Sequence, residues 1–419
     1  MQRRVFMKSG ALALVTIGLN PSFLRRSVYG AGVTSAPRGK TLVVLFQRGA
    51  ADALNVVVPF AEPFYYQARP NIAVPPPRAG AANCAIDLDG SFGLHPSLAP
   101  LHDLYTRGLL APIHAVGSPS STRSHFDAQD YMETATPDVK GTTTGWLNRY
   151  LATAGTCEAC AAGPASPFRA VAMTPQTPRA LDGPSPTVAM DSIDAFTLRA
   201  AGGNAERLEA LYRTGSADLV HASGAEMFDA MKMLRAANPQ QYAPANGAAY
   251  PASPFGQKLR QVAQLIKARV GLEVAFADVG GWDTHVNQGG ATGQLAQRLG
   301  DFAQGIAALV QDLGDRMADV VILTMSEFGR TVRQNGNGGT DHGHATTMFV
   351  AGGTVKGHRV YGRWPGLAPE QLYEGRDLAL TTDFRAVFAE VASRQLGATR
   401  LDEVFPGYGS RPAEWLGVL

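Results

Sequence analysis

Alternating amphipathic helices and short apolar strands in the second half of the chain constrain its fold more than any other feature. Apolar residues spaced three or four apart cover residues 255–266, and a longer stripe of the same kind covers residues 295–313. Each stripe leads into a short apolar run, residues 272–277 and 320–323, which predicts a buried strand. Helices that alternate with apolar strands indicate an α/β fold with a mainly parallel central sheet.

The first half of the chain shows the same pattern. Residues 41–46 and 109–116 have the composition of buried strands, and residues 96–106 between them predict a helix that stops at Gly108. A strand-helix-strand unit predicts parallel strands in one sheet. We therefore expect residues 40–419 to form a single α/β domain.

Residues 190–254 interrupt this alternation and have weak strand character. We expect them to form a helical insertion beside the sheet. Just upstream, Cys157 and Cys160 lie in a stretch rich in alanine, glycine and proline. Outside the cytoplasm this pair could close a small disulfide loop, which would leave Cys84 unpaired.

The first 31 residues predict a twin-arginine export signal. Arg3 and Arg4 are followed by Phe6 and Lys8, and the apolar run at residues 11–19 is too short to span a bilayer. We therefore expect the twin-arginine translocase to export the protein to the periplasm or the cell exterior. This route carries folded proteins, which fits a metal or cofactor that is loaded in the cytoplasm.

The composition narrows the classes of partner. The 419-residue chain has a net charge of +2, and 17% of its residues are charged. These values give no indication of nucleic-acid binding. The hydrophobic share of 45% suits a globular protein with a large core.

Carboxylates and histidines cluster in the loops next to three predicted strands, residues 272–277, 320–323 and 348–351. The residues concerned are Asp283, His285, Glu327, Asp341, His342 and His344. Open α/β sheets bind ligands beyond the carboxyl ends of their strands, so a site is expected in these loops.

Carboxylate oxygen and neutral imidazole nitrogen are the ligand atoms that zinc, manganese or iron bind in proteins. We predict that the six residues converge in one pocket and bind a divalent metal such as zinc, manganese, calcium or magnesium. The alternative is that Asp283 caps its loop and that His342 and His344 are ordinary loop residues.

Further candidate residues lie next to the strands of the first half. Arg48 and Asp52 follow residues 41–46. Ser124 stands where a helix should begin and has the properties of its N-cap. It could be a nucleophile at the rim of the pocket, with Arg123 or free backbone N–H groups stabilising the charge of an ester, or it could be a cap only. His125 is either a ligand or a core-facing residue.

Five short motifs together resemble the twin-arginine-exported family called "domain of unknown function 1501", and they span nearly the whole mature chain. The motifs are residues 48–55, 123–130, 281–285, 326–330 and 340–343. Arg330, which ends the fourth motif, is a further candidate site residue. The family in turn is remotely similar to the alkaline phosphatase and sulfatase superfamily. This resemblance implies a three-layer α/β sandwich with metals at the strand ends.

The superfamily resemblance can be transferred to particular residues only in part. It implies that Asp283 and His285 hold a metal, that His342 or His344 replaces a later histidine, and that Ser124 is the nucleophile. Two positions depart from the pattern. Phe328 stands in place of a histidine, and Gln47 stands near the place of a missing aspartate.

Two functional classes follow from these features. The first is an exported metal-dependent hydrolase of phosphate or sulfate esters, which would act on a small-molecule or glycan ester. The second is a non-catalytic exported protein that uses the same fold for binding or envelope assembly. The clustered Asp and His residues favour the first class, and Phe328 and Gln47 favour the second.

Overall fold

The computed structural model describes residues 39–154, 166–193 and 242–419. The predicted export signal, the Cys157 and Cys160 pair, and most of the predicted helical insertion at residues 190–254 lie outside these ranges. Cys84 is a buried, free thiol. No helix within the described ranges is long and apolar enough to cross a membrane.

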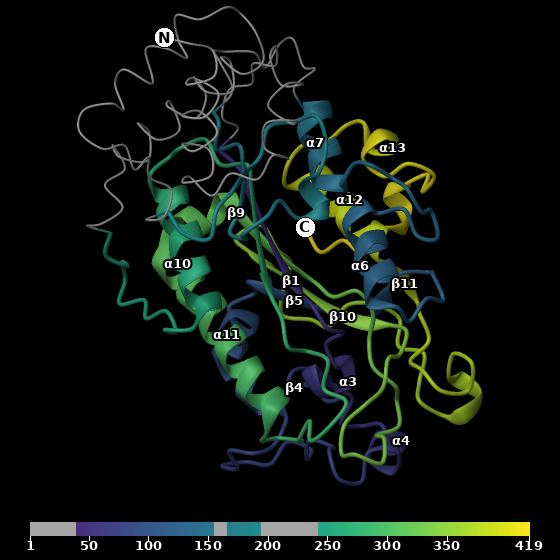
Figure 1. Ribbon diagram of the computed structural model, residues 1–419. Helices are drawn as coiled ribbons and strands as arrows, with labels where there is room; N and C mark the ends of the chain where they lie inside the picture. The colour runs from purple at the N-terminus through teal and green to yellow at the C-terminus, as the bar shows by residue number, and fades with distance from the viewer. Residues whose placement is uncertain (1–38, 155–165, 194–241) are drawn as a thin grey trace, which may run out of the picture.

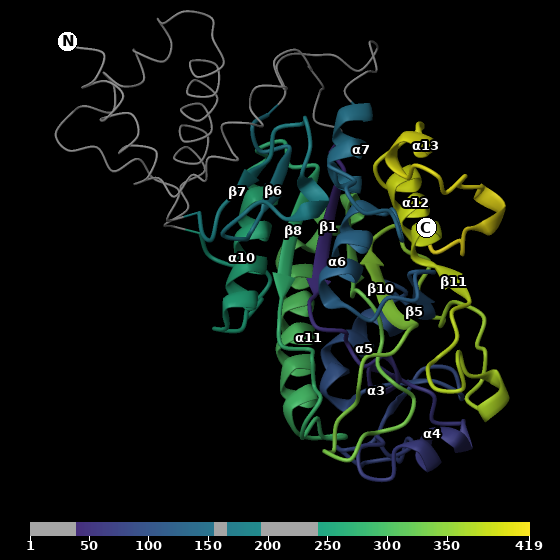
Figure 2. The same cartoon turned by 45° about the vertical axis from the view of Figure 1, so that its right-hand side comes forward.

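An eight-stranded sheet runs through the molecule in the order β11-β5-β10-β9-β1-β8-β6-β7, and its strands are labelled across Figures 1 and 2. Its strands in chain order are β1 (Thr41–Gln47), β5 (Leu110–Gly117), β6 (Ala170–Ala172), β7 (Val188–Ala189), β8 (Val274–Val279), β9 (Val320–Met325), β10 (Thr346–Gly352) and β11 (Thr382–Asp383). Within this sheet β10 pairs antiparallel with β5 and β9, and the other pairs are parallel. The predicted mainly parallel α/β sheet is confirmed.

The strand-helix-strand unit predicted for the first half differs from expectation in one respect. β1 and β5 run in the same direction, but β9 and β10 lie between them. The chain also forms a small antiparallel sheet of β2 (Val57–Val58), β3 (Ile86–Asp87) and β4 (Gly93–Leu94), and two short helices, α3 (Ala53–Val56) and α4 (Pro63–Ala68). The neighbours of β1 come from more than 200 residues away, so local sequence patterns do not specify the strand order.

Helices cover both faces of the sheet (Figures 1 and 2). One face carries α5 (Ala99–Thr106), α10 (Pro254–Lys267) and α11 (Gln294–Leu313), and the other carries α6 (His125–Thr134), α7 (Trp146–Ala154), α12 (Phe384–Arg394) and α13 (Leu401–Val404). Along β1, Val43 and Leu45 pack into the first layer, whereas Leu42, Val44 and Phe46 pack into the second. Because both faces are buried, the strands are continuous apolar runs.

The direction of β10 decides where the polar loop between β9 and β10 lies. The loop of residues 326–345 leaves the carboxyl end of β9 and enters the amino end of β10. Since these two strands are antiparallel, both ends of the loop lie at the edge where β1 and β8 also end. The predicted polar loops therefore share one edge of the sheet.

His114, on β5, provides a test of this fold that is independent of the site. Its ring is buried between Phe92 and Trp364, with centroid distances of 4.6 and 5.1 Å. Burial lowers the pKa of His114 from 6.5 to about 4. The unfolded chain therefore binds a proton at a higher pH than the folded protein does, and stability is lost as pH falls below 6.5.

We expect this one residue to cost about 2 kcal/mol of unfolding free energy between about pH 7 and about pH 5. His114→Leu should remove that part of the acid sensitivity, because leucine does not titrate. Urea unfolding of both proteins at the two pH values measures the difference. Equal acid losses in the two proteins would show that His114 is accessible to protons in the folded state.

Candidate metal centre

Tightly packed backbone brings the loops after β1, β8 and β9 together. Gly49 lies so close to the loop after β8 that an added Cβ would be 2.7 Å from the backbone nitrogen of Asp283. The backbone N–H of Gly49 donates to Glu327 Oε1 over 2.8 Å. Gly339 touches the same loop, since an added Cβ would be 2.4 Å from the carbonyl of His285. Only glycine allows these close approaches.

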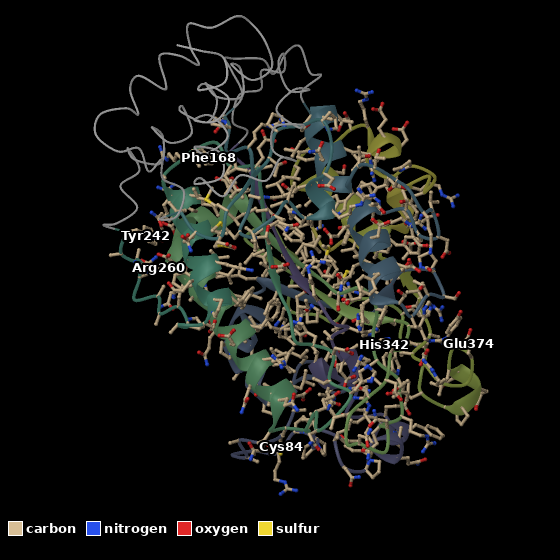
Figure 3. All side chains as sticks on the ribbon, viewed as in Figure 1. Cys84, Phe168, Tyr242, Arg260, His342 and Glu374 are labelled. Atoms are coloured by element: carbon tan, nitrogen blue, oxygen red, sulfur yellow. The ribbon has the colours of Figure 1, made fainter. Side chains whose placement is uncertain are left out.

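Three imidazole rings converge on Asp283 at this edge. The Nε2 atoms of His285 and His342 lie 3.0 and 3.3 Å from Asp283 Oδ1. The Nε2 atom of His125 lies 3.5 Å from Asp283 Oδ2. His285 Nε2 and His342 Nε2 are 3.0 Å apart. The predicted residues Asp283, His285 and His342 are therefore together, and His125, at the start of α6, completes the group. Figure 3 labels His342 at this end of the sheet.

The other nitrogen of each ring faces a hydrogen-bond acceptor. His125 Nδ1 lies 2.7 Å from Glu327 Oε1, and His285 Nδ1 lies 3.0 Å from Asp341 Oδ1. His342 Nδ1 lies 2.8 Å from the backbone oxygen of Arg123. An acceptor at Nδ1 selects the tautomer with a proton there and leaves the Nε2 lone pair free.

In this tautomer the Nε2 lone pairs are available to a cation. With both protons on Nδ1, the Nε2 lone pairs of His285 and His342 face each other across 3.0 Å and repel. His125 Nε2 is buried and has no hydrogen-bond partner. A cation that accepts these lone pairs would satisfy all three nitrogens. The ligand atoms of His125, Asp283 and His342 lie within 4.8 Å of one another, which is close enough for one ion.

The protonation tendencies of His125, His342 and Asp283 differ. The hydrogen bond to Glu327 raises the pKa of His125 against the opposing effect of burial. Burial lowers the pKa of His342. For Asp283, burial favours a higher pKa, but the hydrogen bond and charge of Arg330 outweigh it and the net pKa is lowered. A metal ion would have to displace a proton from protonated His125, so metal affinity should rise as pH rises.

Glu327 and Asp341 lie behind the histidines rather than among the converging atoms. Glu327 is fully buried, and besides His125 its Oε1 accepts from Gln129 Nε2 over 2.8 Å. Asp341 Oδ1 accepts from Asn335 Nδ2 over 3.1 Å as well as from His285. The sequence predicts both carboxylates as metal ligands. The structure places them where they orient and polarise the histidines that face the centre.

Other predicted site residues are close but bound to different partners. His344 is buried and stacks on Tyr373, with ring centroids 4.2 Å apart, so it is not one of the converging histidines. The guanidinium of Arg123 pairs with Glu374 and Asp377 at 2.6 and 2.8 Å. Its backbone oxygen, rather than its charge, contacts the centre.

Arg330 is in direct contact with the centre. It is buried, and its Nη1 donates to Asp283 Oδ1 over 2.7 Å. Its Nε donates to Thr340 Oγ1 over 3.2 Å. The arginine therefore fixes one carboxylate oxygen of Asp283 and supplies a positive charge beside it.

Ser124 caps α6, as the sequence predicts. Its hydroxyl accepts from the backbone N–H of Asp127 over 3.5 Å. The described contacts do not join this hydroxyl to the converging nitrogens. The position after the cap is His125, so the helix start positions a histidine at the centre.

Arg48 and Asp52 form ion pairs that hold the loop after β1 in place. Arg48 pairs with Glu133 and Asp278, each over 2.9 Å. Asp52 is fully buried and pairs with Arg69 over 2.6 Å. These contacts fix the loop after β1 and are not directed at the converging nitrogens.

Two contributors were absent from the predicted site. Gln129 links Arg48 to Glu327, and Phe328 packs its ring 5.0 Å from His125 and 5.1 Å from His342. The spacing of His125 and Gln129, four residues apart on a helix, was a usable signal for the first. Phe328 stands out in the sequence only as a departure from the superfamily's histidine, and an aromatic residue after a strand is common in any core, so its contact with the histidines was not predicted.

The chain matches a family described as "Protein of unknown function (DUF1501)" over residues 39–405. That range includes every strand of the large sheet and every loop that reaches the candidate centre. No curated protein and no solved structure matches.

Proposed function

Because the chain belongs to the DUF1501 family, whose function is unknown, its activity has to be inferred from the site, and we propose a divalent-metal-dependent hydrolase of phosphate or sulfate esters. One observation carries the proposal. Three histidines have their Nδ1 atoms held by acceptors and their Nε2 atoms directed at one carboxylate. Histidines held in this way, with Nε2 atoms that converge from separate loops, are typical of metal sites, which supports the proposal.

The proposed ligands are His125, His342 and Asp283, with His285 as the fourth. Ligand atoms about 2.1 Å from a tetrahedral ion lie about 3.4 Å apart. The histidine nitrogens lie 3.0 to 3.5 Å from Asp283, close to that spacing. Three imidazoles and one carboxylate favour zinc or manganese, since calcium and magnesium prefer oxygen ligands.

A divalent cation held there could expand to a fifth position, where it would lower the pKa of a water molecule or polarise an ester oxygen. The residues of the chain supply the rest. Glu327 and Asp341 orient His125 and His285, and Phe328 packs against the rings and limits their movement. We propose water rather than Ser124 as the nucleophile, because the serine hydroxyl caps α6.

The proposal is tested by hydrolysis of sulfate and phosphate esters of nitrophenol with purified protein. Activity should require zinc or manganese, and a chelator should remove it. Restored activity after the metal is added back is the expected control result. If none of these esters is hydrolysed by protein with one bound metal ion, the hydrolase proposal fails.

One observation favours the alternative, a non-catalytic binding or envelope-assembly module. Arg330 already neutralises Asp283 over 2.7 Å, so part of the need for a cation is met within the chain. In that case the protein would keep its thermal stability in the presence of a chelator. A metal ion that binds only the folded state should instead make the melting temperature depend on metal concentration.

The loop of residues 333–341 provides a steric test of the proposed centre. Gly339 touches the backbone of His285, and the added methyl of Gly339→Ala would be 2.4 Å from it. We expect the displaced His285 to lower metal affinity by about tenfold. Gly336→Ala is the matched control, because no atom lies within 4 Å of an added Cβ there. Calorimetric titration with zinc measures the metal affinity of the two variants. Equal zinc affinities would show that the contact with Gly339 does not hold His285 in place.

We further propose twin-arginine export and a remote relation to the alkaline phosphatase and sulfatase superfamily. The first rests on Arg3 and Arg4, and cell fractionation tests it, since the mature protein should be found outside the cytoplasm. The second is supported by a carboxylate and a histidine after β8 and a carboxylate after β9. Phe328 and Gln47 remain departures from that superfamily's pattern.

A further inference from the structure

The arginines that contact the candidate centre or its supporting residues are each paired with a carboxylate. The pairs are Arg48 with Glu133 and Asp278, Arg123 with Glu374 and Asp377, Arg330 with Asp283, and Arg376 with Asp377. Their charges are therefore largely neutralised before any substrate arrives.

The centre itself is close to neutral when a divalent cation is bound. Asp283, Glu327 and Asp341 provide the negative charges, and Arg330 together with the cation balances them. Among the described residues, a substrate with two negative charges would find no unpaired arginine there. A bound monoanion would leave the centre with one excess negative charge and a dianion would leave it with two, so the electrostatics favour a monoanion.

Exposed apolar side chains directly follow two of the converging histidines in the chain, and we call these two, Phe126 and Val286, the apolar rim. The large hydrophobic residues that are exposed in the described ranges are Phe126 at 90%, Val139 at 54% and Val286 at 49%. Phe126 directly follows His125, and Val286 directly follows His285. Neighbouring Cα atoms are about 3.8 Å apart, so both side chains start beside the converging histidines. Exposed apolar residues beside a polar centre are typical of ligand-binding sites.

We propose that the site accepts esters whose tetrahedral group carries one negative charge and whose alcohol part is an apolar aryl or alkyl group. Sulfate monoesters and phosphate diesters share this chemistry. This inference rests on the proposed function and narrows its substrate class. Hydrolysis forms a bond from water oxygen to sulfur or phosphorus, breaks the ester bond and gives the water proton to the departing alcohol, so it needs no co-reactant.

Binding of two matched anions tests the charge preference without requiring turnover. Benzenesulfonate carries one negative charge, and phenylphosphonate carries two at mildly alkaline pH. We expect the zinc-loaded protein to bind the sulfonate at least about threefold more tightly in calorimetric titration. Equal binding, or tighter binding of the phosphonate, overturns the proposed preference.

Two variants, Val286→Ala and Phe126→Ala, test the apolar rim, and Val139→Ala is their control. Val286→Ala should weaken sulfonate binding about threefold, because methyl groups that contact the aryl ring are lost. Val139→Ala is the matched control, because Val139 is similarly exposed but does not follow a proposed ligand. The affinity of this variant for the sulfonate should not change. Phe126→Ala should weaken binding about tenfold. If sulfonate affinity is unchanged in both rim variants, while dimer formation or vesicle binding is lost, the rim belongs to a second copy or a lipid surface and the proposal is wrong.

Hydrolysis separates this inference from the proposed function. Nitrophenyl sulfate and bis(nitrophenyl) phosphate should be cleaved with a higher kcat/KM than nitrophenyl phosphate. If sulfonate binding shows the expected preference but no ester is cleaved, the ligand class stands and the hydrolase proposal falls. If nitrophenyl phosphate is the best substrate, the hydrolase stands and the charge preference is overturned.

Discussion

His125→Ala is expected to lower metal affinity by on the order of a hundredfold or more, and to abolish metal-dependent hydrolysis with it. The variant removes a nitrogen that is buried without a hydrogen-bond partner and directed at Asp283. It also deprives the buried carboxylate of Glu327 of one donor. Metal content after dialysis, measured by elemental analysis, checks the result.

His344→Ala is the control for that experiment. His344 was also predicted to be a ligand, but it stacks on Tyr373 away from the converging nitrogens. Its replacement should leave the metal content unchanged, although the lost packing lowers stability by about 2 kcal/mol. If His344→Ala loses the metal and His125→Ala retains it, then His344 is the ligand and His125 is not.

Glu327→Gln is expected to lower metal affinity about 10- to 100-fold, although Glu327 is not a proposed ligand. The amide has the size of the carboxylate but lacks its charge, so His125 becomes a weaker donor to a metal ion. Glu327 is fully buried and bonded to four different donors, which leaves it little freedom to compensate. Zinc titration of the variant measures the change.

Asp341→Asn is the matched comparison for Glu327→Gln. Asp341 supports His285 in the same way, but its side chain is 56% exposed. Water can replace part of its effect, so the loss of affinity should be about tenfold or less. A larger loss in Asp341→Asn than in Glu327→Gln would mean that His285, and not His125, is the better supported ligand. Unchanged affinity in both variants would remove the orienting role of the carboxylates.

The parts of the fold that follow from local patterns were predictable. The apolar runs of β1, β8 and β9 and the stripes of α10 and α11 identify buried strands and helices, because burial on both sides leaves a continuous apolar sequence. The antiparallel direction of β10 and the two strands between β1 and β5 were not predictable. They depend on pairing between distant segments, and no local pattern records that pairing.

The residues of the candidate site were also predictable only where a local pattern identifies them. Asp283, His285 and His342 could be identified because each stands in a loop at a strand end. Whether a residue in such a loop is a ligand or a support depends on the direction of a side chain. Glu327 points back toward His125 and Gly49, and the partners of Arg123 are about 250 residues away. The orientations of these side chains cannot be predicted from local sequence.

A crystal structure of the protein grown with zinc, with the anomalous signal of zinc recorded, tests the central claim most directly. The expected result is one peak about 2.0–2.2 Å from the Nε2 atoms of His125 and His342 and from a carboxylate oxygen of Asp283. His285 Nε2 should complete the coordination, with Glu327 and Asp341 still bonded to the Nδ1 atoms. A crystal that binds zinc elsewhere, or that keeps Asp283 bonded to Arg330 with no ion among the histidines, would contradict the proposed metal centre.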